Sequence, residues 1–226
     1  MSGPTPRGDI DPSEWVNPKI TYDTVAAAYA ETFLHELDHK PFDRELLTRF
    51  AAAITSTTTT ATPLCDLGCG PGHIGAYLAE LGLPTVGIDL STGMVEQARL
   101  CYPSLTFAEG DMTALTLADG SLAAVVSFYA LIHIPRSVVP VALSEMHRVL
   151  APGGSVLIAV HGGQGTLHAT KMLEQPCALD ATLFTLPELC AMVSAAGFSI
   201  TEAHERDPVE EELTTPRLYL WATSGN

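Results

Sequence analysis

From Pro63 to the end of the chain, short apolar runs typical of β-strands alternate with segments of helical periodicity. Parallel strands need a crossover connection, usually a helix, so this alternation predicts a mostly parallel sheet covered by helices on both faces. One run is apolar throughout, as expected of a strand buried on both faces. The predicted strands are Leu64–Leu67, Thr85–Asp89, Leu105–Glu109, Ala123–Phe128, Ser155–His161, Phe198–Glu205 and Arg217–Thr223.

The first part of the chain has a different character. Residues 1–20 carry four prolines and two glycines, which predicts a flexible arm. Apolar residues then recur every four positions, which predicts a helix from Thr21 to about His39, and a second helix is expected over 42–54. The Thr-rich residues 56–63 are expected to form a connector. We therefore expect a single domain over residues 21–226.

Three glycines follow the first predicted strand at alternate positions, in the segment LCDLGCGPGH (64–73). Gly68, Gly70 and Gly72 allow backbone torsions closed to other residues and leave room for a ligand beside the main chain. In open α/β sheets, ligands bind beyond the carboxyl ends of the strands, which is where this turn would lie.

Acidic residues accompany the ends of the first three predicted strands. Asp66 lies in the first, Asp89 ends the second, and Asp111 follows the third, with Met112 next to it. A carboxylate at Asp89 can accept two hydrogen bonds from a ribose diol. At Asp111 a carboxylate can accept one from an adenine amino group while Met112 packs on the base. The sequence therefore predicts a nucleoside site at this edge of the sheet.

These motifs resemble those of the class I S-adenosylmethionine-dependent methyltransferases, particularly the small stand-alone ones that modify metabolites. DLGCGPG is similar to the first motif of that family, GIDLS to the second, GDM to the adenine motif, and LAPGG to a later one. The resemblance implies a Rossmann-like α/β fold of seven strands. Its last strand, Arg217–Thr223 here, would be antiparallel and inserted between the fifth and sixth.

The resemblance also implies a cofactor, S-adenosyl-L-methionine, and residues that hold it. Asp66, Gly68, Gly70 and Gly72 would hold the methionine part, Asp89 the ribose, and Asp111 and Met112 the adenine, with further cofactor contacts from Tyr22, Tyr29, Leu90 and Phe128. Residues 21–54 would form a helical lid, residues 63–161 the cofactor-binding half, and residues 162–226 an acceptor-side insertion and the C-terminal strands.

Two other functions fit parts of the pattern. Gly70–Gly75 matches GxGxxG, the fingerprint of NAD-dependent oxidoreductases, but a carboxylate at Asp66 would repel a pyrophosphate. A non-catalytic module that binds S-adenosylmethionine would carry the same glycines and acids. The two differ on the acceptor side, because an enzyme should form a closed pocket lined by residues 22–37, 128–135 and 161–184, whereas a binding module need not.

Four residues are candidates for acid–base chemistry on the acceptor. His133 follows the fourth predicted strand and His161 ends the fifth, and a neutral imidazole can accept a proton near pH 7. His168 and Glu174 lie in the insertion over 162–184, which in similar proteins often shapes the acceptor pocket. The first choice for a general base is His133, and His161 is the second.

Charge and composition limit the partners. With 11 basic against 26 acidic residues and a net charge of −15, nucleic acids and anionic membranes are not expected partners. No apolar run is long enough to cross a bilayer and no signal peptide is visible, so we expect a cytoplasmic protein. The five cysteines form no CxxC pair, and no metal site is predicted. The acidic run between 202 and 212 is expected to be solvated.

The predicted function is methyl transfer to an oxygen or nitrogen of a small molecule, with a secondary metabolite as the expected acceptor.

Overall fold

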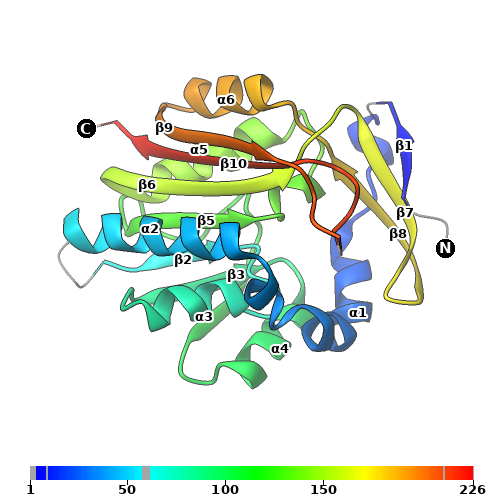
Figure 1. Ribbon diagram of the computed structural model, residues 1–226, viewed down its shortest axis with the longest axis horizontal. Coiled ribbons are helices and arrows are strands. Elements are labelled where there is room, and N and C mark those ends of the chain that lie inside the picture. The colour runs from blue at the N-terminus through cyan, green and yellow to red at the C-terminus, as the bar shows by residue number, and fades with distance from the viewer. Residues whose placement is uncertain (1–3, 9, 58–61, 211, 226) are drawn as a thin grey trace.

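A computed structural model describes residues 4–8, 10–57, 62–210 and 212–225, so residues 58–61 of the predicted connector lie outside the described residues. Its main feature is a seven-stranded sheet (Figure 1). The strands are β2 (Leu64–Leu67), β3 (Thr85–Asp89), β4 (Thr106–Glu109), β5 (Leu122–Phe128), β6 (Leu150–His161), β9 (Phe198–Arg206) and β10 (Arg217–Ser224).

The strand order of this sheet is β4-β3-β2-β5-β6-β10-β9. The first five of these strands are mutually parallel, and β10 pairs antiparallel with both β6 and β9. The predicted Rossmann-like α/β fold is confirmed, including the antiparallel last strand between the fifth and sixth. The order reverses at β2, so the glycine turn after β2 lies at the switch point where such sheets bind ligands.

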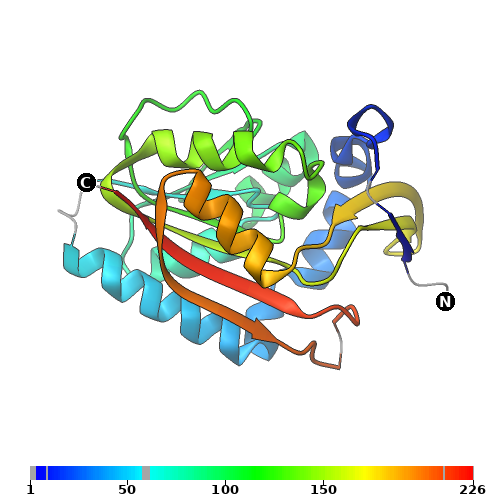
Figure 2. The same cartoon turned by 90° about the horizontal axis from the view of Figure 1, so that it is seen from above.

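Helices cover both faces of the sheet (Figure 2). On one face α2 (Pro41–Thr57) and α3 (His73–Glu80) bury side chains such as Phe50 and Leu78 against β5, β6 and β10. On the other, α5 (Val139–Val149) and α6 (Leu186–Ala195) pack Leu143 and Leu189 onto the same strands. Because both faces are covered, the inner strands are apolar throughout, with β5 buried from Leu122 to Ser127.

Local signals set several helix ends. Ser91 caps α4 (Thr92–Cys101) by accepting a hydrogen bond from the Met94 amide. Thr185 and Glu188 form the predicted capping box at the start of α6. The first helix, α1 (Pro18–Phe33), differs from the prediction at both ends: Asn17 caps it and Pro18 occupies its first turn, so it begins three residues earlier than Thr21. It also ends at Phe33, and a separate short 3₁₀ helix follows at Glu36–His39.

A second, three-stranded sheet forms from two distant parts of the chain. Strand β1 (Thr5–Arg7), in the predicted arm, pairs antiparallel with β7 (Thr166–Met172), and β7 forms a hairpin with β8 (Gln175–Thr182). Of the arm, residues 1–3 and 9 lie outside the described residues. Figure 1 shows α1 and this small sheet beyond the carboxyl ends of the parallel strands. The insertion over 162–184 is therefore placed beside the predicted site.

Within the described part of the chain, none of the helices combines the length and the apolar character that a bilayer crossing requires.

The inserted strand β10 provides a test of the core. Leu220 is fully buried, whereas Leu100 on α4 is 75% exposed. Leu220→Ala should lower the free energy of unfolding by about 2–5 kcal/mol, because it removes buried methyl groups and leaves a cavity. Leu100→Ala is the matched control and should change it by less than about 0.5 kcal/mol. Urea unfolding followed by circular dichroism measures both, and equal effects would contradict the placement of β10.

Candidate active site

A cavity of about 1100 Å³ opens at the carboxyl ends of the parallel strands. The glycine turn after β2 forms one side of it and the hairpin β7–β8 contributes to the other. Gly72, His168 and Glu174 are not among its described lining residues. Twelve of the residues predicted to bind a cofactor or act on an acceptor line this cavity: Tyr22, Tyr29, Asp66, Gly68, Gly70, Asp89, Leu90, Asp111, Met112, Phe128, His133 and His161.

The glycine turn is tied to the neighbouring strand β3 by backbone hydrogen bonds. The amides of Gly68 and Cys69 donate to the Ile88 carbonyl at 2.7 and 3.1 Å, and the Gly70 amide donates to the Asp89 carboxylate at 2.8 Å. Gly68 has φ +75°, and a Cβ there would lie 2.1 Å from the Cβ of Ala130. This position therefore requires glycine for both its torsion and its close contact.

Gly72 is placed differently from the prediction. It is not among the described residues that line the cavity, and it lies at the start of α3 with φ +87°. A Cβ at this position would lie 2.8 Å from the ring of Phe107. Close packing of the turn against β4 explains this glycine without a ligand contact.

The three predicted acids have different surroundings. Asp66 is 1% exposed, accepts a hydrogen bond from the Gly75 amide at 2.8 Å, and burial raises its pKa to about 7. Asp89 accepts from the amides of Gly70 and Ser91, and burial raises its pKa above the usual value. Asp111 is exposed and accepts from the amide and hydroxyl of Thr113. Asp66 and Asp89 are thus rigidly held, and Asp111 stands at the solvent edge of the cavity.

Helix α1 is fastened next to the glycine turn by its charged side chains. Asp23 accepts hydrogen bonds from the Ser91 hydroxyl at 2.6 Å and the Gly93 amide at 3.0 Å. Lys19 donates to the Leu90 carbonyl and the Thr92 hydroxyl. These contacts keep Tyr22 and Tyr29, which meet edge to face at 5.8 Å, on the cavity wall.

His133 uses both of its ring nitrogens. Its Nδ1 lies 3.1 Å from the backbone carbonyl of Asp180, which can only accept, so Nδ1 carries the proton of the neutral ring. Its Nε2 then accepts from the Tyr22 hydroxyl at 2.7 Å. Burial lowers the pKa of His133 to about 4, so the ring is neutral at pH 7.

His161 is stacked on Tyr129, with the ring centroids 5.2 Å apart. Its Nδ1 lies 3.2 Å from the Thr215 hydroxyl, and no described residue forms a hydrogen bond with its Nε2. Burial, together with the positive charge of Arg217, lowers the pKa of His161 to about 3. The two weaker candidates, His168 and Glu174, are not among the described residues that line the cavity; each instead pairs with a neighbour, Asp180 and Lys171 respectively.

Several residues of the cavity wall lie in segments expected to shape the acceptor pocket but were not predicted individually. The small sheet supplies an apolar part of the wall: Leu167, Ala169, Met172, Leu179 and Ala181. Tyr129, directly after β5, has φ +55°, an uncommon torsion for a residue other than glycine. Tyr129 follows Phe128, which is a predicted cofactor contact, and nothing in the local sequence pattern distinguishes the two aromatic residues.

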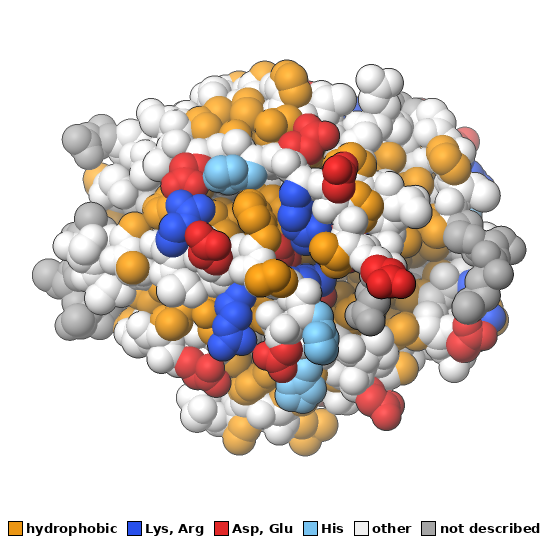
Figure 3. All heavy atoms as spheres, in the orientation of Figure 1, with side chains coloured by type: hydrophobic (Ala, Val, Ile, Leu, Met, Phe, Trp, Pro, Cys, Tyr) orange, Lys and Arg blue, Asp and Glu red, His pale blue; other side chains and the backbone are white. Residues whose placement is uncertain are grey.

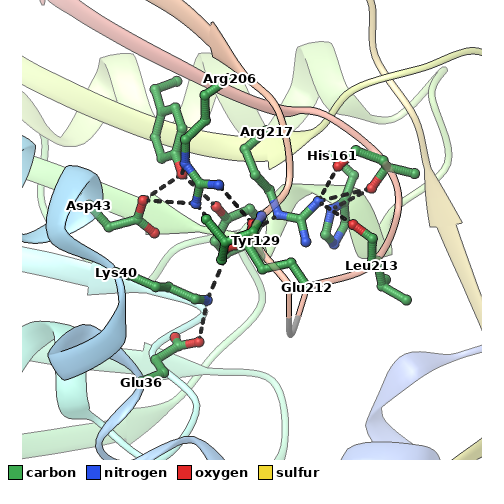
Figure 4. Close-up of polar contacts among 12 residues, drawn as sticks. Glu36, Lys40, Asp43, Tyr129, His161, Arg206, Glu212, Leu213 and Arg217 are labelled. Atoms are coloured by element: carbon green, nitrogen blue, oxygen red, sulfur yellow. Dashed lines mark hydrogen bonds and ion pairs between the residues drawn. The ribbon is translucent and has the colours of Figure 1, made fainter.

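Charged side chains of both signs gather beside Tyr129 (Figure 4). Lys40 lies 5.6 Å and Arg217 5.7 Å from its ring centroid. Glu212 pairs with both of these cations and with Arg206. The prediction of a solvated acidic run is therefore wrong for Glu212, whose side chain is 4% exposed because three cations surround it; Glu211 of that run lies outside the described residues.

The raised pKa of Asp66 has a consequence for stability. Between the unfolded pKa of 3.8 and the folded value of about 7, the folded protein binds a proton that the unfolded chain lacks, so this group lowers stability as pH rises. Asp66→Asn can keep the Gly75 hydrogen bond and removes the ionisation. Its stability relative to the parent protein should increase by about 2–3 kcal/mol between pH 5 and pH 8.

Urea unfolding at the two pH values measures this difference. Asp38→Asn, at a carboxylate with a 59% exposed side chain, is the control and should show no such change. An equal difference at pH 5 and pH 8 for Asp66→Asn would contradict the assignment.

Comparison with known proteins agrees with this geometry. Residues 64–154 match a family described as a methyltransferase domain. A demethylmenaquinone methyltransferase of Beutenbergia cavernae is 43% identical over 94 residues, which are 42% of this chain and 38% of the relative. The chain thus spans about two fifths of the length of that relative.

Solved structures extend the likeness of fold over most of the chain. A Methanosarcina mazei protein described as a SAM-dependent methyltransferase matches with a TM-score of 0.68 and 19% identity, over 76% of this chain and 97% of its own. A 1,6-didemethyltoxoflavin-N1-methyltransferase of Burkholderia thailandensis, solved with S-adenosylhomocysteine, matches with a TM-score of 0.64 and 18% identity, over 99% and 95%. Together with the inserted antiparallel strand, these matches show that the chain has the fold of S-adenosylmethionine-dependent methyltransferases and that residues 64–154 are similar to a methyltransferase domain.

Proposed function

We propose that the protein transfers a methyl group from S-adenosylmethionine to an oxygen or nitrogen of a small, largely apolar molecule. The observation that carries the proposal is the cavity itself, which joins the glycine turn and the acids of β2 and β3 to the apolar wall of the hairpin β7–β8. A module that only bound the nucleoside would not need this second compartment. A secondary metabolite would suit its size and lining.

The residues present fit the cofactor. No described atom lies within 4 Å of a Cβ built on Gly70, so a ligand can approach this main chain closely. Asp66 provides a buried anion for an ammonium group, and Asp89 provides oxygens for a ribose diol. The carboxylate of Asp66 would repel the pyrophosphate of NAD, so the oxidoreductase alternative is not favoured, although Asp89 could also hold an NAD ribose.

When bound, S-adenosylmethionine supplies an electrophilic methyl group on a sulfonium. The chain would hold this end between the glycine turn and Phe128, with helix α1 closing the site through Tyr22 and Tyr29. On this proposal residues 21–54 act as the lid, 63–161 as the cofactor-binding half, and 162–226 as the acceptor side. The acceptor would be positioned against Tyr129 and the hairpin.

The pair formed by Tyr22 and His133 would take the proton that the acceptor loses. The Tyr22 oxygen accepts the proton from the acceptor while its own proton passes to Nε2 of His133. Nδ1 remains bonded to the Asp180 carbonyl, which fixes the ring in the required tautomer. A low pKa at His133 is tolerable because the acceptor proton becomes strongly acidic as the new bond to carbon forms.

The partners expected from the charge fit the same proposal. On the face shown in Figure 3, basic side chains are interspersed with acidic ones rather than gathered in a broad area. Such a surface offers no continuous track for a phosphate backbone. We therefore propose a small-molecule acceptor and no nucleic acid partner.

The ribose assignment can be tested by binding alone. Asp89→Ala should weaken binding of S-adenosylhomocysteine about 100-fold, because it removes a charged acceptor of two hydrogen bonds. Glu109→Gln, at the exposed end of the neighbouring strand β4, is the control and should change the affinity less than about threefold. Isothermal titration calorimetry measures both, and unchanged binding by Asp89→Ala would remove the assignment.

The proton-accepting pair can be tested by turnover. Release of S-adenosylhomocysteine in the presence of fractionated cell extract identifies an acceptor. With that acceptor, His133→Ala and Tyr22→Phe should each lower kcat by roughly 100-fold. His204→Ala, at a histidine that is not among the described residues lining the cavity, is the control. A loss below tenfold in both variants would assign the pair to packing, and silence with all extracts would favour the non-catalytic module.

A further inference from the structure

One end of the acceptor compartment is polar, and its two buried members come from neighbouring strands. Arg217 is the first residue of β10 and His161 the last of β6, and antiparallel pairing sets them opposite each other. Arg217 is 3% and His161 9% exposed, yet both line the cavity. Figure 4 shows Arg217 between His161 and Glu212.

The hydrogen bonds around Thr215 connect Arg217 to His161. Nη1 of Arg217 donates to the Thr215 hydroxyl oxygen at 3.0 Å. The Thr215 hydroxyl can then donate its proton to Nδ1 of His161, 3.2 Å away. In that tautomer the proton of the neutral imidazole sits on Nε2, which has no hydrogen-bond partner among the described residues, and His161 lines the cavity.

Arg217 also has a donor left for a ligand. Its Nη1 is used by the Leu213 and Thr215 carbonyls and the Thr215 hydroxyl, and its Nε lies 3.6 Å from Glu212. Glu212 is itself bound by both terminal nitrogens of Arg206, at 2.7 and 2.8 Å. No described residue accepts a hydrogen bond from Nη2 of Arg217, so two N–H donors from different strands face the same compartment.

We propose that the methyl acceptor carries a carboxylate that binds to Nη2 of Arg217 and Nε2 of His161. This inference rests on the proposed function and adds the chemical class of its acceptor. Two donors match the two oxygens of a carboxylate, and Glu212 offsets part of the local positive charge, which favours a monoanion over a phosphate dianion. His161 is then a binding donor rather than a second base, and the rest of the acceptor lies against Tyr129 and the apolar hairpin.

The experiment uses matched pairs of carboxylate and amide probes on the protein saturated with S-adenosylhomocysteine. Saturation ensures that the carboxylate of the cofactor product already occupies its own place. Benzoate with benzamide, and octanoate with octanamide, differ mainly in charge. At least one carboxylate should bind roughly tenfold or more tightly than its amide in a titration followed by NMR.

Two variants locate the effect. Arg217→Met removes the guanidinium, and His161→Phe keeps the stacking on Tyr129 while removing the Nε2 donor. Each should lower carboxylate affinity by roughly tenfold and leave the amide affinity and the binding of S-adenosylhomocysteine within about twofold. Since Arg217 is buried, His161→Phe keeps the test decisive if Arg217→Met does not fold.

The outcomes separate this inference from the proposed function. Failure of the parent protein to bind S-adenosylhomocysteine would overturn the proposed function. With that binding intact, equal affinities within both probe pairs would overturn the carboxylate site. An equal loss of carboxylate and amide binding in His161→Phe would also overturn it.

Discussion

The carboxylate of Asp89 holds together the part of the molecule on which the site depends. One of its oxygens accepts from the Gly70 amide and the other from the Ser91 amide, each at 2.8 Å. This joins the glycine turn after β2 to the end of β3 and to the start of α4. Because Asp23 of α1 binds the same segment through Ser91 and Gly93, the helix over the cavity is fixed to the same carboxylate. The position of α1 over the cavity thus depends on the hydrogen bonds at the end of β3.

Burial keeps both His133 and His161 neutral, and their different hydrogen-bond partners give them different roles. His133 meets a carbonyl on one side and a phenol on the other, so its lone pair points at Tyr22. His161 meets a hydroxyl that accepts from Arg217 and can donate to Nδ1, which is the arrangement that the proposed carboxylate site uses. The partner of Nδ1 thus fixes the tautomer of His133, because a carbonyl can only accept. On the proposal, two residues of the same type present opposite hydrogen-bonding character to one compartment.

The cofactor side of this fold could be predicted because its signals are local. Glycine spacing, strand-end acids and caps such as Ser91 and Thr185 each act within a few residues, and they led to the correct sheet and to the glycine turn and strand ends that line one side of the cavity. The acceptor side depends on contacts between distant segments. Arg217 and Glu212 meet Lys40 across more than 170 residues, and the burial of Glu212 follows from that meeting. At Gly72 the local pattern predicts a ligand contact, and packing against the ring of Phe107 also requires glycine there.

The antiparallel insertion of β10 divides the molecule into parts that can diverge separately. Only a strand running against its neighbours brings its first residue, and the loop before it, to the edge where the parallel strands end. That loop and the hairpin β7–β8 both follow residue 161, whereas the nucleoside side is built before it. On the proposed function, substrate choice can therefore evolve by exchange of C-terminal segments while the residues proposed to hold the methyl donor are inherited unchanged.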